Sequence, residues 1–148
     1  MISTRGRYAV RILANMAGRP EGAAIPLREM AEEEDISLKY LESIMRTLVK
    51  AGIIEGTSGK GGGYRLSVRP EECRLGDVLR ATEGDLAPTA CMGPNATPCS
   101  RTTQCRARPV WKGLAVRIDE YLDSITIADL IRRSEEEIIN APTKRMED

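Results

Sequence analysis

The feature that most constrains the fold is a glycine-rich stretch, GTSGKGGGY at residues 56–64, that separates two short runs of strand-forming residues. Ile53 and Ile54 precede it, and YRLS follows from Tyr64. Glycine adopts positive φ at low steric cost, so this composition predicts the tip of a β-hairpin. It does not match a phosphate-binding Walker loop, because no Gly-Lys-Ser/Thr closes it and a strand follows where that motif has a helix.

Three helical segments are predicted ahead of this hairpin. Residues 7–17 repeat apolar side chains at helical spacing, with Ser3 and Thr4 as candidate caps before them. A shorter helix is predicted from Pro26 to the acidic run EEED. In the third segment Ser37 is a good N-cap and Gly52 a good stop. The predicted inner faces carry Val10, Leu13, Ala14 and Ala17, then Leu27, Met30 and Ala31, then Leu41, Ile44, Met45 and Leu48. This order of elements is that of a winged helix-turn-helix, so the predicted fold is mainly α with a small β-hairpin wing.

The rest of the chain is predicted to be an appendage to this domain. The expected parts are residues 1–69, the DNA-binding winged helix-turn-helix; 70–109, a linker, a short helix over 76–82 and a cysteine loop; 110–133, a dimerisation helix and terminal turn; and 134–148, a flexible tail. Thr126 is expected to cap the terminal turn.

The long helix carries an apolar stripe whose members are Trp111, Leu114, Ile118, Tyr121 and Ile125. A stripe of about four turns usually requires a partner helix, which favours a homodimer. The same periodicity would also arise if the helix folded back on its own N-terminal domain, since spacing alone does not identify the covering surface.

The second helix of a helix-turn-helix enters the major groove of DNA, where side chains near its N-terminus meet base edges. The candidate DNA-binding residues are Ser37, Lys39, Tyr40, Glu42, Ser43 and Arg46 on the helix, and Ser58 and Lys60 at the hairpin tip. Lys39 and Arg46 can neutralise phosphate or donate to guanine, and Glu42 can accept from cytosine N4. The alternative is a solvated face of an amphipathic helix beside an ordinary flexible hairpin.

Composition excludes several classes of function. The formal net charge is zero, but residues 1–69 are mildly basic, which permits DNA binding by this half. The chain contains neither His nor Phe. The absence of His excludes Ser-His-Asp and Cys-His catalysis, so we expect no enzyme and no small-molecule substrate. With no apolar run of about 18 residues and no signal-peptide layout at the N-terminus, we expect no membrane contact and a cytoplasmic location.

Three cysteines, Cys91, Cys99 and Cys105, lie in the polar segment CMGPNATPCSRTTQC with the spacing C-x7-C-x5-C. Cytosolic thiols stay mostly reduced, and thiolates are preferred ligands of iron-sulfur clusters and zinc. The spacing is not the tight CxxC of a zinc ribbon, so a cluster, zinc and free reactive thiols all remain open. Cys73 could complete the ligand set or could be a small buried hydrophobe.

Several longer motifs of the chain together resemble one protein family. They are STRGRYAVRIL at the start, ISLKYLESIMRTLVKAGII in the third helix, GKGGGYRLS in the hairpin, LGDVLRATEG after the linker, and the three-cysteine segment before VWKGL. Over residues 1–132 they closely resemble the Rrf2 family of bacterial transcription regulators, above all its cluster-sensing, IscR-like branch. The resemblance implies a homodimeric repressor or activator, paired through the helix around Trp111 to Ile125, on a partly palindromic double-stranded DNA operator.

The resemblance also carries expectations for single residues. Family members have a recognition-helix glutamate where Glu42 stands, and it helps to select among DNA sites. The family's wing often has an arginine where this chain has Ser58. In the IscR-like branch three cysteines and a nearby histidine hold a 2Fe-2S cluster. The residue at the histidine position is Arg108, and another branch has an aspartate where this chain has Arg7. Because arginine is a poor ligand, the fourth ligand is left open.

The predicted function is therefore a transcription regulator whose operator affinity is controlled by an iron-sulfur cluster, expected to be 2Fe-2S, and which senses iron-sulfur status or oxidative stress. We expect cluster binding to order the cysteine loop and to reposition the recognition helices. The alternatives are a zinc-stabilised DNA-binding module without sensing and a small iron-sulfur electron carrier. An electron carrier would leave the helix-turn-helix and the wing unexplained.

Overall fold

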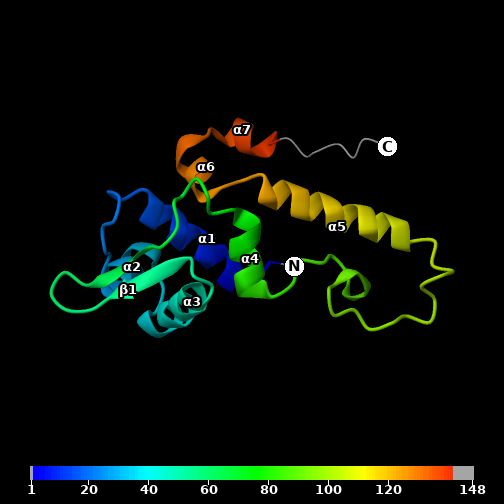
Figure 1. Cartoon of the computed structure of the whole chain (residues 1–148), viewed down its shortest axis with the longest axis horizontal. Helices are drawn as coiled ribbons and strands as arrows, with labels where there is room; N and C mark the ends of the chain where they lie inside the picture. Colours follow the sequence, from blue (N-terminus) through cyan, green and yellow to red (C-terminus); the bar gives the residue numbers. More distant parts are fainter. Residues whose placement is uncertain (1, 142–148) are drawn as a thin grey trace.

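The computed structural model describes residues 2–141 (Figure 1). Its elements are α1 (Thr4–Ala17), α2 (Leu27–Glu34), α3 (Leu38–Lys50), β1 (Ile54–Thr57), β2 (Gly63–Leu66), α4 (Leu75–Glu83), the 3-10 turn η1 (Ala90–Met92), α5 (Arg108–Asp123), α6 (Ile127–Arg132) and α7 (Glu135–Ile139). The predicted fold class, mainly helical with one antiparallel hairpin, is confirmed. Among the described residues, no helix combines the length and hydropathy that crossing a bilayer requires.

The core lies where α1, α2 and α3 meet, and two further helices extend it: α4 packs against both α1 and α3, and α6 packs against α1. The predicted inner face of α3, formed by Leu41, Ile44, Met45 and Leu48, is fully buried. Each such side chain contributes about 1.5–3 kcal/mol when it leaves water. Predicted caps are present on both α1 and α3: the Ser3 hydroxyl accepts from the Gly6 amide at 3.3 Å and the Ser37 hydroxyl from the Tyr40 amide at 3.2 Å.

The hairpin is fixed to the helical domain through β2. This strand pairs with β1 in the register Ile54↔Leu66 to Thr57↔Gly63, and on its other edge Tyr64 forms a bridge with Ile25. Two amide-to-carbonyl hydrogen bonds of 2.9 Å close the bridge. A side chain at Gly63 would overlap the Ile25 carbonyl oxygen. The close backbone approach therefore requires glycine at this position, and it sets the angle at which the hairpin leaves the domain.

Helix α4 holds the C-terminal half of α5. The Arg80 guanidinium donates to both carboxylate oxygens of Asp123, at 2.9 and 3.0 Å, and to Asp119 at 3.0 Å. Gly76 lies directly under the Asp123 carboxylate, where any side chain would collide with it. Because the planar guanidinium donates to two carboxylates one helical turn apart, it fixes both the orientation of α5 and its distance from α4.

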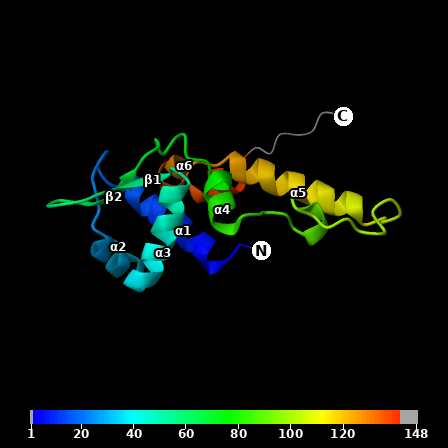
Figure 2. The same ribbon diagram turned by 60° about the horizontal axis from the view of Figure 1, so that its bottom comes forward.

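The apolar stripe of α5 is divided between two environments. Leu122 near its end and Ile125 just beyond it are buried against the domain. Val110, Trp111 and Leu114 in the first half are exposed, and this half extends away from the domain (Figures 1 and 2). The prediction that Ile125 belongs to the dimerisation stripe is therefore corrected. It lies past the end of the helix, where its carbonyl accepts from the Leu75 amide at 2.8 Å.

The C-terminal segment is more ordered than predicted. Thr126 caps α6 as expected, in a capping box with Asp129. The segment after residue 134 is not only a frayed tail, because Ser134 caps a further short helix, α7. The Tyr121 hydroxyl donates to the Ile138 carbonyl at 3.2 Å and joins α7 to α5. Residues 142–148 of the predicted tail lie outside the described part of the chain.

We predict that Gly63→Ala destabilises the domain more than Gly61→Ala does. Both glycines have positive φ, 154° at Gly63 and 78° at Gly61, but only Gly63 meets another backbone segment. We expect a loss of about 1 kcal/mol for Gly61→Ala from backbone strain alone, and about 3 kcal/mol for Gly63→Ala because Ile25 must also move. Urea unfolding of both variants measures the difference, and equal losses would contradict this account of the bridge.

Candidate DNA-binding face and cysteine loop

The exposed face of α3 carries three of the predicted DNA-binding side chains. Lys39, Glu42 and Arg46 all point into solvent, and none of them makes a side-chain hydrogen bond or ion pair within residues 2–141. They are therefore available to another molecule. Leu38, at the first position of the helix, is also 41% exposed and was not predicted. An exposed apolar group beside polar ones at a helix N-terminus can contact a thymine methyl group.

The other predicted residues of this helix are engaged within the protein. Tyr40 is half-buried and its ring meets that of Tyr8 edge-on, with centroids 6.0 Å apart. The Ser43 hydroxyl accepts from the Arg5 guanidinium at 2.8 Å, and Ser37 serves as the N-cap. The contact between Arg5 and Ser43 was not predicted, because the sequence around Arg5 does not indicate which helix its side chain contacts.

The hairpin tip carries the last two predicted DNA-binding residues, Ser58 and Lys60, and both are exposed. The tip extends beyond the helices of the domain (Figure 2). Neither side chain makes a hydrogen bond or ion pair inside the described part of the chain. A slender projecting tip with one unpaired cation can reach along a duplex from the groove that a helix occupies.

The cysteine loop is residues 84–107, between α4 and α5. Cys91 lies in η1, where the Thr89 hydroxyl is 3.2 Å from its sulfur. The Cys99 carbonyl accepts from the Thr102 amide and hydroxyl, at 3.1 and 2.8 Å. Cys105 comes shortly before α5. All three thiols are exposed and unbridged.

The donors in this loop suit a thiophilic metal by their chemistry, because thiolates are the ligands that iron-sulfur clusters and zinc prefer. Within residues 2–141, however, no three Cys, Asp or Glu side chains are gathered closely enough to hold a metal ion. The three thiols would therefore have to be drawn together by closure of the loop. A pocket of about 300 Å³ lies at the base of the loop, between α4, residues 84–94 and α5.

The loop and the start of α5 form a cationic segment. No Asp or Glu occurs between Leu86 and Ile118, whereas the basic side chains there are Arg101, Arg106, Arg108, Lys112 and Arg117. A carboxylate ligand cannot come from within this stretch. Arg108 is the first residue of α5 and is half-buried. A cation at this point cannot ligate a metal, but it can stabilise an anionic metal-thiolate group nearby.

Cys73 is a core residue and not a candidate ligand. It is 4% exposed and packs in the main hydrophobic cluster, and its carbonyl accepts from the Ile127 amide at 2.8 Å. Burial raises the pKa of its thiol from 9.0 to about 11, and the nearby Asp77 charge adds to the rise. The thiol therefore stays protonated at physiological pH. The possibility of ligation by Cys73, left open by the sequence, is removed by its burial.

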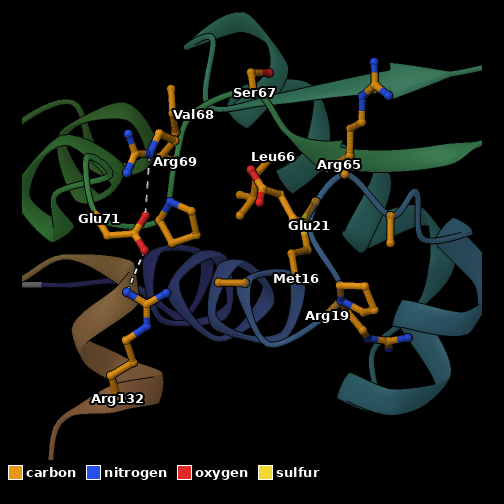
Figure 3. A pocket seen from close by; sticks show the side chains of 15 residues that line it. Met16, Arg19, Glu21, Arg65, Leu66, Ser67, Val68, Arg69, Glu71 and Arg132 are labelled. Carbon is orange, nitrogen blue, oxygen red and sulfur yellow. Dashed lines mark ion pairs between the residues drawn. The ribbon is translucent and has the colours of Figure 1, made fainter.

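A second groove, larger than the one at the base of the cysteine loop, lies among α1, β2 and α6 and has a volume of about 720 Å³ (Figure 3). Four arginines line it, and each is paired with a carboxylate. Glu71 lies between Arg69 and Arg132, at 4.0 and 2.6 Å, while Arg65 pairs with Glu55 and Arg19 with Glu29. The Glu71–Arg132 pair holds the segment after β2 against α6. Together the pairs leave no unpaired arginine in the groove for an anionic ligand.

Comparison with known proteins identifies the family of a chain that combines this winged helix-turn-helix with a cysteine loop. Residues 2–133 match the profile of Rrf2, an iron-dependent transcriptional regulator. The chain belongs to the Rrf2 family. The regulator IscR of Aliivibrio salmonicida is 35% identical over 130 residues, which cover 88% of this chain and 76% of that relative. IscR of Vibrio atlanticus is 33% identical over 134 residues, which cover 90% and 76%. This Rrf2 chain is therefore an IscR-like transcriptional regulator and not an enzyme.

Solved Rrf2 structures have the same fold. CymR, the global cysteine regulator of B. subtilis, superposes with a TM-score of 0.77 at 28% identity, covering 91% of this chain and 98% of that one. IscR of T. potens superposes with a TM-score of 0.71 at 32% identity, covering 92% and 89%. The resemblance to the Rrf2 family and the winged helix-turn-helix fold are thus both confirmed.

We predict that Cys73 differs from the other thiols in reactivity. In the native protein at pH 8, a chromogenic thiol reagent should titrate the three exposed cysteines quickly and Cys73 only after denaturation. Because Cys73 keeps its proton to about pH 11 when folded but loses it near pH 9 when unfolded, its contribution to stability should fall as pH rises from 9 to 11. Cys73→Ala should flatten this part of the wild-type pH profile. Rapid titration of all four native thiols would contradict the assignment.

Proposed function

We propose that this Rrf2 protein is a DNA-binding transcriptional regulator whose operator affinity depends on an iron-sulfur cluster, expected to be 2Fe-2S, held by Cys91, Cys99 and Cys105. The observation that carries the proposal is the presence, in one Rrf2 chain, of three exposed thiols in a loop and an unpaired polar face on the recognition helix. The sensed signal would be iron-sulfur status or oxidative stress.

The exposed face of α3 supports DNA binding in which some residues contact the backbone and others distinguish bases. Lys39 and Arg46 lie seven positions apart, two helical turns, so together they can contact phosphates or guanine along one groove. Glu42, between them, can accept from a cytosine amino group and would supply discrimination. Lys60 and Ser58 at the hairpin tip would contact the neighbouring groove or backbone. Ser43, Tyr40 and Ser37 would contribute mainly by shaping the helix, because they are engaged inside the protein.

The cysteine loop supports the sensing role. When bound, an iron-sulfur cluster supplies chemistry that responds to iron supply and to oxidants. The three thiols would draw residues 91–105 together, and the arginines of the cationic segment would stabilise the negative charge that thiolate ligation creates. The fourth ligand is not Cys73 or Arg108. It would be a hydroxyl, backbone, water, a small thiol such as glutathione, or a carboxylate from outside the stretch between Leu86 and Ile118.

The first half of α5 supports pairing with a second copy of the chain. Val110, Trp111 and Leu114 are 62%, 37% and 43% exposed on a helix that extends from the domain. An exposed apolar face of this kind is covered in an oligomer. We propose that residues 1–69 read DNA, residues 70–109 carry the sensor and residues 110–133 pair the two copies. A two-fold dimer of this kind would fit a partly palindromic operator in the cytoplasm.

A zinc-stabilised DNA-binding module is the second candidate, because three thiols in a polar loop would also suit zinc. The two differ in what they predict for the loop. Zinc would give a colourless and permanent centre, whereas an iron-sulfur cluster would absorb visible light and be lost on oxidation. The incomplete protein ligand set favours the labile centre, since a structural zinc site usually has four protein ligands.

We predict that anaerobic reconstitution with iron and sulfide gives a visible absorption that bleaches on reduction. Cys99→Ala should lose this absorption, while Cys73→Ala, the matched control, should keep it. Operator selection from random DNA with and without the reconstituted centre then tests the function. We expect one enriched motif whose affinity differs between the two states by about 5- to 150-fold. Colourless stoichiometric zinc would support the second candidate, and the absence of any enriched motif in either state would exclude DNA reading.

We predict distinct effects for the three exposed α3 residues. Lys39→Ala and Arg46→Ala should weaken binding to all DNA and lower the slope of log affinity against log salt by about 1 per lost phosphate contact. Glu42→Ala should change the preference at one base pair by about 1–3 kcal/mol. Arg7→Ala and Glu72→Ala, which make the same charge changes outside α3, serve as controls. An unchanged salt slope, or equal losses on every operator for Glu42→Ala, would remove the residue concerned from its role.

A further inference from the structure

The first turn of α1 contacts two elements far away in the sequence. One is the recognition helix α3, and the other is the end of α4, where the cysteine loop begins. Both contacts are made by side chains or amides of residues 3–6, within a single helical turn. None of these residues is among the proposed DNA contacts or metal ligands.

Arg5 makes the contact with α3. Its guanidinium donates to the Ser43 hydroxyl at 2.8 Å, to the Ser43 carbonyl at 2.8 Å and to the Thr47 hydroxyl. Ser43 directly follows Glu42, the residue proposed to discriminate between bases. Three bonds from one planar, half-buried group fix both the rotation and the position of α3 relative to α1.

Glu83 makes the contact with the cysteine loop. It is the last residue of α4, and the loop starts at Gly84. The Ser3 amide and hydroxyl both donate to the same Glu83 oxygen, at 3.0 and 2.7 Å. Gly6 packs beneath, and a side chain there would overlap this oxygen. The N-terminus of α1 favours a carboxylate because the helix dipole places a partial positive charge there.

We infer that the first turn of α1 is a joint that transmits the state of the cysteine loop to the recognition helix. Arg5 is the positioning residue for α3, and the Ser3–Glu83 contact ties that turn to the start of the loop. Closure of the loop pulls on Glu83, and through residues 3–5 it shifts the face that carries Glu42. This inference rests on the proposed function, and it names the path by which the metal centre regulates DNA binding.

The positioning role of Arg5 is tested by a charge-conserving pair, Arg5→Lys and Arg7→Lys. Lysine keeps the charge but cannot make the three forked bonds. Arg7 lies in the same helix and is exposed, and among residues 2–141 its side chain bonds only to Thr4, so it is a matched control. For Arg5→Lys we expect a tenfold or greater loss of operator preference over random DNA, with random-DNA affinity unchanged. For Arg7→Lys we expect no change in the preference. Equal effects would overturn the positioning role, and thermal unfolding checks that both variants fold.

The transmission is tested by the ratio of operator affinities between reconstituted and metal-free protein. Gly6→Ala changes no charge and adds a good helix former, but it displaces Glu83 from Ser3. Glu83→Gln weakens the same contact by removing the charge, and Glu72→Gln is the matched control. We expect the ratio to fall towards one in Gly6→Ala and Glu83→Gln, with metal content and metal-free affinity retained, and to stay at the wild-type value in Glu72→Gln.

The outcomes separate the joint from the proposed function. A wild-type ratio of one would overturn metal-controlled DNA binding and the joint with it. A wild-type ratio that differs from one and persists in both joint variants would overturn the joint alone. A ratio that falls only because the variants no longer bind metal would also count against it, since the joint transmits the state of the loop and does not create the metal site.

Discussion

Burial of one face of α1 is the interaction on which the rest of the structure depends. Ala9, Ile12 and Leu13 are completely buried, and the helix packs against α3, α4 and α6, while α4 also contacts α3 directly. The recognition helix, the base of the cysteine loop and the segment after α5 are all placed relative to this single element. Because well-packed interiors do not deform continuously, a shift of α4 against α1 requires a matching response in α3.

The sequence predicted the elements whose signals are local. Caps at Ser3, Ser37 and Thr126, the helical periodicity of α3 and the glycines of the hairpin each specify an element from neighbouring residues. The features that could not be predicted from the sequence depend on contacts between segments far apart in the chain. Nothing near Arg5 identifies Ser43 as its partner, and the spacing that placed Ile125 in the stripe of α5 does not reveal that the chain has already turned. The placement of Cys73 likewise depends on a distant contact, because its carbonyl accepts from the amide of Ile127, 54 residues further along the chain.

The cysteine loop differs from the rest of the fold in how it gains order. It has few apolar side chains to bury, and its contacts within the described residues are mostly turns between neighbours, such as Thr102 on Cys99. A segment of this composition does not offset the entropy of a fixed conformation by itself. A ligand that joined the three thiols, as we propose, would supply the missing stabilisation, and the conformation of the loop would then depend on that ligand.

The distribution of ion pairs explains how a chain with zero net charge can bind DNA. Three acidic side chains of α2 face α1, where Arg11 pairs with Glu34 and Arg19 pairs with Glu29 and Glu33. These carboxylates are neutralised locally, at distances shorter than the screening length of about 8 Å at physiological salt. Lys39, Arg46 and Lys60 have no such partners in residues 2–141. If these three residues contact DNA as we propose, they would set the charge that faces the phosphate backbone, and the net charge of the whole chain would not measure it.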